Sequence, residues 1–217
     1  MSLSASALVT LAEVKQHLGI PAGAEAKSPL LEEIANRASD AVAEYLDRQL
    51  INVASITEYH SLRTPAGQPV VSSVLQTRQW PIVTVTSVHE STGWPRTYGA
   101  SELLVADTDY TVSKPAGKLY RLESSIANWA TGFRTVKVVY TAGYTQATVP
   151  ARIKAVVLRL CAVMWAEVDR ALFGVSTQSD QLGNFTRFAP ARLTDDMKAD
   201  LVAERRSRLY DTGEVDA

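Results

Sequence analysis

The sequence contains a single cysteine, Cys161, and only three histidines among its 217 residues. One thiol cannot form an intramolecular disulfide, and it cannot supply the set of thiolates that a zinc or iron–sulfur site needs. His17, His60 and His89 are too far apart in the sequence for the close spacing of a helical metal site. We therefore expect no metal centre, and we expect His60 and His89 to be hydrogen-bonded structural residues. The low cysteine content fits a reducing compartment.

An excess of charge and a long hydrophobic run are also lacking. The 22 basic and 23 acidic residues give a formal net charge of -1, so no global positive field draws the chain onto DNA or anionic membranes. The most apolar stretch, residues 155–168, contains Arg159 and is shorter than the about 20 apolar positions of a membrane helix. The first ten residues show no export signal. We expect a soluble cytoplasmic protein with no membrane partner.

Apolar residues at helical spacing are present in three segments, residues 10–19, 28–50 and 150–173. Thr10 and Glu13 form a capping box that begins the first helix. Ser28 is the expected cap of the second helix, with Pro29 in its first turn, and Pro150 begins the third. The third helix is apolar around most of its circumference, and we expect it to be central.

Between about residues 57 and 144 the hydrophobic period changes to two, which predicts short antiparallel strands. The expected strands are residues 57–62, 70–76, 82–89, 110–112, 118–122 and 136–141. Residues 174–190 are polar and predict a long mobile arm, and Thr194 begins a last charged helix to about Tyr210. The fold class is therefore α+β: a helical bundle with an inserted small antiparallel β-sheet and an extended C-terminal arm with a final helix. We expect a core of residues 1–173 and an arm of residues 174–217.

Known catalytic and ligand-binding motifs are each incomplete in this sequence. Asp107 and Asp109 resemble the start of a calcium loop, but Val112 stands where that loop needs glycine. Lys118 follows a glycine without the serine or threonine of a phosphate-binding loop. Ser176 lacks the second glycine and the strand-to-helix context of a nucleophile elbow. Cys161 lies on the apolar face of a helix, which predicts a buried, unreactive thiol. We expect no enzymatic activity and no cofactor.

Basic and aromatic residues are interleaved in the strand region: Arg78, Trp80, Trp94, Arg96, Tyr98, Arg121, Trp129 and Arg134. Residues 51–149 hold eight basic and six acidic side chains, an excess too small to predict a nucleic-acid groove. The alternative is that Trp80, Trp94 and Trp129 fill the sheet core or a subunit interface, where aromatic residues are enriched.

Several short sequence segments, taken in their order along the chain, resemble those of one protein family. They are LAEVKQHL at residues 11–18, the helix of residues 30–50, WPIVTVTSV at 80–88, DYTV at 109–112, VKVVYTAGY at 136–144 and VPARIKA at 149–155. Together they resemble the head-tail connector, or adaptor, proteins of long-tailed bacteriophages and gene transfer particles. The resemblance covers about residues 8–173, and the strand–glycine–helix junction at residues 140–154 is its most specific part. The β insertion and the C-terminal arm match nothing that can be placed residue by residue.

The resemblance implies a structural protein of the virion neck, made in the bacterial host cytoplasm. Its subunits would form a ring, usually of twelve copies, beneath the portal and around the DNA channel. The implied partners are further copies of this chain, the portal protein and a stopper or other neck protein. Contact with the passing double-stranded DNA would be non-specific, because the chain has no recognition motif.

Two sets of residues are candidates for these contacts. Apolar and basic residues of the arm and last helix are candidates for portal docking: Leu182, Phe185, Phe188, Leu193, Arg205, Arg206 and Arg208. Acidic residues of the second helix are candidates for a channel lining that repels phosphate: Glu32, Glu33, Asp40, Glu44 and Asp47. A solvated outer face is the alternative for the acidic set, and packing on its own domain is the alternative for the last helix.

Three other functions remain open from sequence. A stopper or tail terminator would be dominated by β structure, which the three long helices oppose. A small hydrolase would need a clustered site that the residue spacing does not reveal. A helical DNA-binding regulator is opposed by the acidic second helix.

Overall fold

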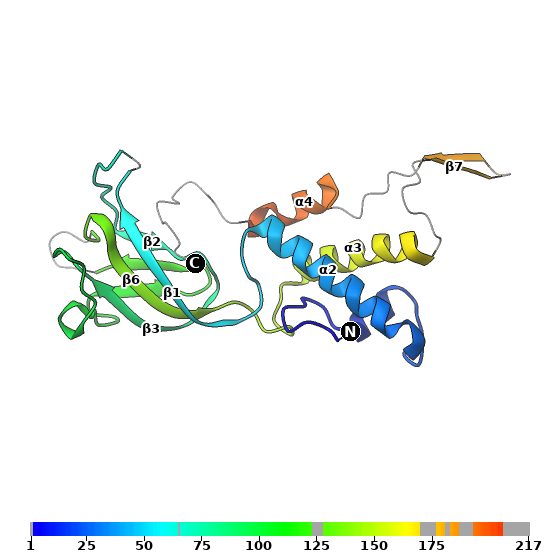
Figure 1. Cartoon of the computed structure of the whole chain (residues 1–217), viewed down its shortest axis with the longest axis horizontal. Helices are drawn as coiled ribbons and strands as arrows, with labels where there is room; N and C mark the ends of the chain where they lie inside the picture. Colours follow the sequence, from blue (N-terminus) through cyan, green and yellow to red (C-terminus); the bar gives the residue numbers. More distant parts are fainter. Residues whose placement is uncertain are drawn as a thin grey trace. The chain divides into compact units, whose positions relative to one another are not determined.

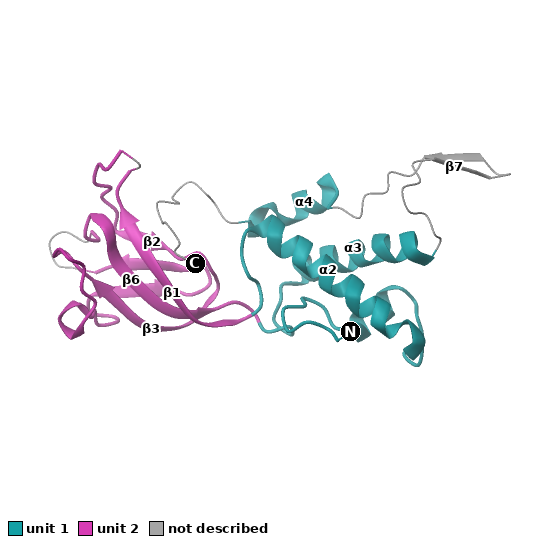
Figure 2. Ribbon diagram, in the orientation of Figure 1, with its two compact units in different colours: residues 1–51, 145–205 teal, residues 52–144, 206–217 magenta. Residues whose placement is uncertain are grey.

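The computed structural model describes residues 2–64, 66–122, 128–169 and 193–205, and the backbone of residues 177–180 and 183–186. These residues form two compact units (Figure 1, Figure 2). Unit 1 is helical and combines Met1–Ile51 with Thr145–Arg205, and unit 2 contains the strands of Asn52–Tyr144. Within the described residues, the chain therefore passes from the helical unit into unit 2 after Ile51 and returns at Thr145, as expected for a β insertion. The α+β fold class is confirmed.

The first helix of unit 1, α1 (Leu11–His17), has the predicted capping box. The N–H of Glu13 donates to the Thr10 hydroxyl, and the N–H of Thr10 donates to the Glu13 carboxylate at 2.7 Å. Lys154, from the start of another helix, lies 2.7 Å from the same carboxylate. The capping residues therefore also hold two segments of unit 1 together.

The second helix, α2 (Ser28–Leu46), follows the 3₁₀ turn η1 (Glu25–Lys27) and ends four residues before the predicted end. Asp47 is in the left-handed conformation, with φ 57° and ψ 38°, and this conformation ends the helix. Ser28 is the first helical residue and not the expected cap, and its hydroxyl lies 3.3 Å from the Glu25 carboxylate. The apolar residues that α2 buries are Leu31, Ile34, Ala35, Ala38, Val42 and Leu46.

The helix α3 (Ala151–Asp169) packs against both α1 and α2. It buries one face and not most of its circumference: Ile153, Val156, Val157, Leu160, Cys161 and Met164. The helix α4 (Asp195–Leu201), capped by Thr194, packs on α3 and continues as the 3₁₀ turn η3 (Val202–Glu204).

The last helix corrects two expectations. It ends at Leu201 and not near Tyr210, because a 3₁₀ turn follows it; residues 206–210 lie outside the described part of the chain. It also belongs to the helical unit and not to a separate arm, since Met197 and Leu201 are buried there. The expected boundary at residue 173 therefore does not separate the two compact units.

Unit 2 contains two three-stranded antiparallel sheets in place of the single small sheet that was expected. One sheet has the order β1 (Val53–Leu62), β6 (Gly132–Ala142) and β3 (Ile82–Glu90). The other has the order β2 (Val74–Gln76), β5 (Lys118–Arg121) and β4 (Tyr110–Ser113). The six strands correspond to the six predicted segments, with shifted ends.

Both sheets contribute to one core in unit 2. Its buried residues are Leu62, Leu75, Ile82, Val88, Tyr110, Leu119, Trp129, Val136, Val138, Tyr140 and Ala142. In β6 the buried residues alternate with half-buried ones, as the period of two predicts. Trp129 fills this core, whereas Trp94 is 79% exposed and Trp80 is half-buried.

The expected arm contains a further element. β7 (Thr177–Asp180) and β8 (Gly183–Thr186) pair as an antiparallel hairpin, which the polar composition did not predict. Among the described residues, no group of three histidine, cysteine or acidic side chains could hold a metal ion. None of the helices in that part of the chain is both long and apolar enough to span a membrane.

Candidate functional site

The five carboxylates expected to line a channel lie along α2 and at its end. Glu32 and Glu33 are half-buried, whereas Asp40, Glu44 and Asp47 are exposed. Their spacing of four and three residues places the exposed three in one row along the helix. We call Asp40, Glu44 and Asp47 the α2 acidic stripe.

The expected portal-docking residues are only partly described. Leu182, Phe188, Arg206 and Arg208 lie outside the described residues, and of Phe185 only the backbone, in β8, is described. Leu193 is half-buried and Arg205 is exposed. The Arg205 guanidinium lies 5.0 Å from the centre of the Tyr45 ring, so this arginine contacts unit 1 itself.

An ion pair that sequence reasoning missed joins the ends of α2 and η3. Arg48, just after α2, is 4% exposed and lies 3.2 Å from the Glu204 carboxylate. The reason is that the helix ends at Asp47, so Arg48 leaves the helical period and turns inward. The Tyr45 hydroxyl donates to the Lys198 carbonyl at 3.4 Å, a second contact between α2 and α4.

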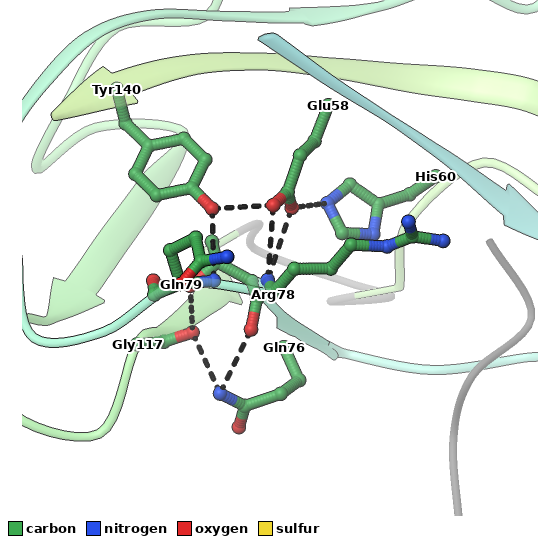
Figure 3. Close-up of polar contacts among 8 residues, drawn as sticks. Glu58, His60, Gln76, Arg78, Gln79, Gly117 and Tyr140 are labelled. Atoms are coloured by element: carbon green, nitrogen blue, oxygen red, sulfur yellow. Dashed lines mark hydrogen bonds and ion pairs between the residues drawn. The ribbon is translucent and has the colours of Figure 1, made fainter. Parts of the chain in front are cut away.

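A buried polar cluster lies inside unit 2 (Figure 3). Glu58 of β1 is 8% exposed, and its carboxylate accepts a hydrogen bond of 2.5 Å from the Tyr140 hydroxyl of β6. The backbone N–H of Arg78 donates to both Glu58 oxygens, at 3.1 and 3.2 Å. His60 Nε2 lies 3.4 Å from the Glu58 Oε2 atom, and the N–H of Gln79 donates to the Tyr140 oxygen. Three groups therefore surround the Glu58 carboxylate, and a fourth bonds to the Tyr140 hydroxyl.

The same cluster fixes the segment between β2 and β3. The Thr77 hydroxyl donates to the carbonyl oxygen of Gly117 at 2.9 Å. The Gln76 amide donates to the same oxygen (Figure 3). Gly117 has a φ of +64°, and a Cβ atom there would lie 2.7 Å from the Cβ of Trp80. The turn before β5 therefore needs glycine for both its conformation and its close contact.

The electrostatics of the cluster fit a structural role. Burial by itself raises the pKa of Glu58, but the contacts with His60, Tyr140 and the Arg78 N–H outweigh it and hold the pKa below its ordinary value. Burial and the neighbouring Glu58 charge raise the pKa of Tyr140 well above its usual range. A carboxylate that several donors hold in its charged form is a weak general base. His60 was expected to be a hydrogen-bonded structural residue; within the described residues its buried Nε2 atom makes no hydrogen bond, and only its place beside the Glu58 carboxylate agrees with a structural role.

The outer surface of the β1–β6–β3 sheet has a different character. Tyr59, Lys137 and His89 are directly opposite one another on the three strands. The Tyr98 ring lies 5.5 Å from the Tyr59 ring, and the Arg134 guanidinium lies 4.1 Å from the centre of the same Tyr59 ring. At the adjacent strand end, Arg63 lies 4.4 Å from the Phe133 ring. We call this surface the aromatic–arginine face: Tyr59, Arg63, Tyr98, Phe133, Arg134 and Lys137.

The positive charges on this face affect its titratable neighbours. Burial and the nearby Lys137 ammonium lower the pKa of His89, although Glu102 opposes this effect. Burial raises the pKa of the Tyr98 hydroxyl, which donates to the Arg134 carbonyl at 2.6 Å. The lowered pKa of His89 and the raised pKa of Tyr98 both favour the uncharged forms of these two side chains near neutral pH.

A pocket of about 490 Å³ in unit 1 is lined by Leu11, Ala12, Lys15, Gln16, Ile20 and Ala22. Its lining is mainly apolar. The charged residue among these, Lys15, donates to the Ala22 carbonyl at 2.9 Å and lies 3.5 Å from the Glu25 carboxylate. This ammonium is held by the protein itself, so the pocket offers space without an evident reactive group.

No known protein family matches the sequence, and no curated protein is similar to it. The fold is similar to that of a chain in a solved structure described as the neck of an empty gene transfer agent (GTA) particle computed with C6 symmetry. The similarity covers 96% of this chain and 94% of that chain, with a TM-score of 0.53 and 17% identity. At this identity the comparison establishes the shared fold, and its coverage includes both units.

Proposed function

We propose that this chain is a structural subunit of the neck that joins the head to the tail of a phage-like particle. The observation that carries the proposal is the similarity, over nearly the whole of both chains, to a chain from the neck of a GTA particle. The motif order at residues 11–18, 80–88 and 140–154 supports the same function, because it resembles the connector family. The neck of the virion is then its location.

A structural and non-enzymatic role agrees with the chemistry of the described residues. The Glu58 carboxylate holds strands together, and burial of Cys161 raises its thiol pKa to about 12. At neutral pH such a thiol is protonated and is a poor nucleophile. Extended surfaces such as the aromatic–arginine face are what a subunit of an assembly needs.

The finer proposal is an adaptor: a closed ring, with twelve copies, directly beneath the portal. Twelve is compatible with the six-fold symmetry of the neck structure, and a head-to-tail contact that closes on itself generates a ring. The proposed apolar anchors on the portal are Leu182, Phe185 and Phe188 of the expected arm. A stopper or another neck protein would bind the opposite side of the ring.

Removal of the gene from the particle-producing strain tests the function. We expect DNA-filled heads without attached tails in electron micrographs, and restoration by the wild-type gene. A reconstruction of the restored neck should place the protein next to the portal. Intact necks in particles without this protein would contradict the neck role. A position nearer the tail would indicate that the protein is a stopper and not an adaptor.

A separate variant tests the proposed docking on the portal. Full-length protein with Leu182→Ser, Phe185→Ser and Phe188→Ser should remain folded but should not copurify with the portal protein. The matched control is Val202→Ser, because this valine is 62% exposed on η3 and lies outside the proposed anchors. Equal copurification of the triple variant and the wild type would exclude these anchors.

A further inference from the structure

The strongest unassigned feature is Trp94, whose side chain is 79% exposed beside the aromatic–arginine face. Its loop is held on both sides. Arg96 donates to the carbonyls of Phe133 and Ser91, at 3.0 and 2.8 Å, and the N–H of Thr97 donates to the Ser91 hydroxyl. Tyr98 is fixed by its ring contact with Tyr59 and by its hydrogen bond to Arg134. The Trp94 indole is therefore exposed to solvent on a loop that hydrogen bonds hold in place.

Such an arrangement lowers the cost of binding a protein. When a partner covers an exposed indole, a large apolar area is removed from contact with water. A loop that is already ordered loses little conformational entropy when it is covered. Tryptophan, tyrosine and arginine are the residues most enriched among those that dominate binding energy at protein interfaces. Trp94 and the aromatic–arginine face combine these three residue types.

Four of the described carboxylates of unit 2 are held in contacts of their own. Glu58 is buried in its own cluster, and Glu90 and Asp109 both pair with Arg121. Glu102 accepts hydrogen bonds from the Thr97 hydroxyl and the Gly99 N–H. Among the described residues, the Arg63 and Lys137 side chains of the face therefore have one carboxylate nearby, that of Glu102, and it is already bonded to its own turn. A partner surface that carries carboxylates would complement it.

The chain itself carries such a surface in unit 1. Asp40 and Glu44 are exposed, one turn apart on α2, and within the described residues neither is in an ion pair. Because the acidic stripe and the aromatic–arginine face are different surfaces of one chain, a contact between them in two copies is heterologous. Such contacts propagate from copy to copy and can close into a ring.

We propose that the aromatic–arginine face and Trp94 of one subunit dock on the α2 acidic stripe of the next copy in the ring. This inference rests on the proposed neck function and names the surface that builds its ring. It assigns Asp40 and Glu44 to a subunit contact in place of the channel lining that the sequence suggested. A protein partner is favoured over duplex DNA, because phosphates would engage the cations and leave the indole in water.

Charge reversal in the full-length protein tests the contact between copies. The face-reversed chain carries Arg63→Glu and Lys137→Glu, and the stripe-reversed chain carries Asp40→Lys and Glu44→Lys. Each chain alone places like charges in every contact, and we expect at least about a tenfold loss of tailed particles when it replaces the wild-type gene. Expression of the two chains together restores opposite charges in an alternating ring, and we expect tailed particles to return. One chain with all four substitutions should also assemble.

One control and one further test variant separate assembly from folding. Lys114→Glu with Lys118→Glu makes the same charge change on the other sheet of unit 2 and should assemble normally. Trp94→Ala changes an exposed side chain, so its thermal unfolding should match the wild type while incorporation into necks falls at least about tenfold. Circular dichroism of each variant shows whether it is folded.

The outcomes distinguish the inference from the function on which it rests. Normal assembly of either single-set chain, or failure of the two chains to rescue each other while both are folded, overturns the docking inference but leaves the neck function. Loss of DNA binding in the face-reversed chain with normal assembly assigns the face to DNA and also overturns it. If particles without the gene have intact necks, the neck function itself fails.

Discussion

The hydroxyl of Tyr140 donates a hydrogen bond of 2.5 Å to the buried carboxylate of Glu58, 82 residues earlier in the chain. The two residues come from neighbouring strands, β6 and β1, and the Arg78 and Gln79 N–H groups bond to the same pair (Figure 3). The pair therefore joins the central strand of one sheet to the segment that enters β3. Because both groups are buried, each depends on the other for its hydrogen bonding.

Replacement of Tyr140 by phenylalanine removes one donor from a buried carboxylate and leaves the ring in the core. We expect the free energy of unfolding to fall by about 1–3 kcal/mol, the usual cost of an unsatisfied buried polar group. Urea denaturation followed by circular dichroism measures it. Tyr120→Phe is the matched control, because Tyr120 is on the exposed side of β5 and should change stability by less than about 0.5 kcal/mol. Equal effects of the two substitutions would contradict the assigned role.

The lowered pKa of Glu58 predicts the direction of acid sensitivity. The folded state binds a proton on this carboxyl more weakly than the unfolded state, whose pKa has the ordinary value near 4.5. The stabilisation is therefore complete above this value and is lost as the pH falls through the lowered pKa of the folded state. Glu13, whose pKa is also lowered although burial alone would raise it, should contribute in the same direction.

Urea denaturation between pH 7 and pH 3 measures this linkage. We expect the wild type to lose stability below about pH 4.5, and we expect Glu58→Gln to be less stable at pH 7 with a flatter pH profile. Glu13→Gln should flatten the profile less, because its carboxylate is partly exposed and its ion pair with Lys154 is screened by solvent. A Glu58→Gln profile parallel to that of the wild type would rule out the assigned linkage.

Local signals in the sequence predicted much of the fold. The capping box of Thr10 and Glu13 depends on residues three apart, and the alternating burial of β6 depends on a period of two, so both can be read without tertiary structure. The end of α2 could not be read in this way. Asp47 adopts a left-handed conformation that its residue type permits but does not require, and Arg48 is buried as a consequence.

The candidate sites were predicted less well, because they combine residues that are distant in sequence. Nothing near Glu58 indicates that Tyr140 will donate to it, or that Arg121 will pair with both Glu90 and Asp109. Trp94 was named among the aromatic residues, but the choice between core and interface needed its exposure. The strand region has only a small excess of basic residues, so its composition did not indicate that the fold brings basic side chains together on one face.

Cys161 should be unreactive in the folded protein. The thiol is buried on α3, and burial raises its pKa to about 12, so almost no thiolate is present at pH 8. We expect no reaction with Ellman's reagent in the native state and one reactive thiol per chain in concentrated denaturant. Rapid labelling of the native protein would show that α3 opens easily or that the thiol is not buried.

The ion pair of Arg48 with Glu204 should hold the last helix on unit 1. The Arg48 side chain has no exposed surface, whereas Glu204 is partly exposed at the end of η3. Removal of the carboxylate by Glu204→Ala leaves a buried guanidinium with one fewer acceptor, and we expect a loss of stability of about 1–3 kcal/mol.

Hydrogen exchange localises this effect. Amides of α4 and η3 should exchange faster in Glu204→Ala than in the wild type, while those of β1 and β6 in unit 2 should not change. Asp200→Asn is the matched control: it breaks the ion pair of Asp200 with Arg159, which has a similar distance of 3.1 Å but lies about half exposed. Exposed pairs contribute less than about 1 kcal/mol, so this variant should keep α4 protected. If both variants release α4 equally, the burial of Arg48 does not determine how the last helix is held.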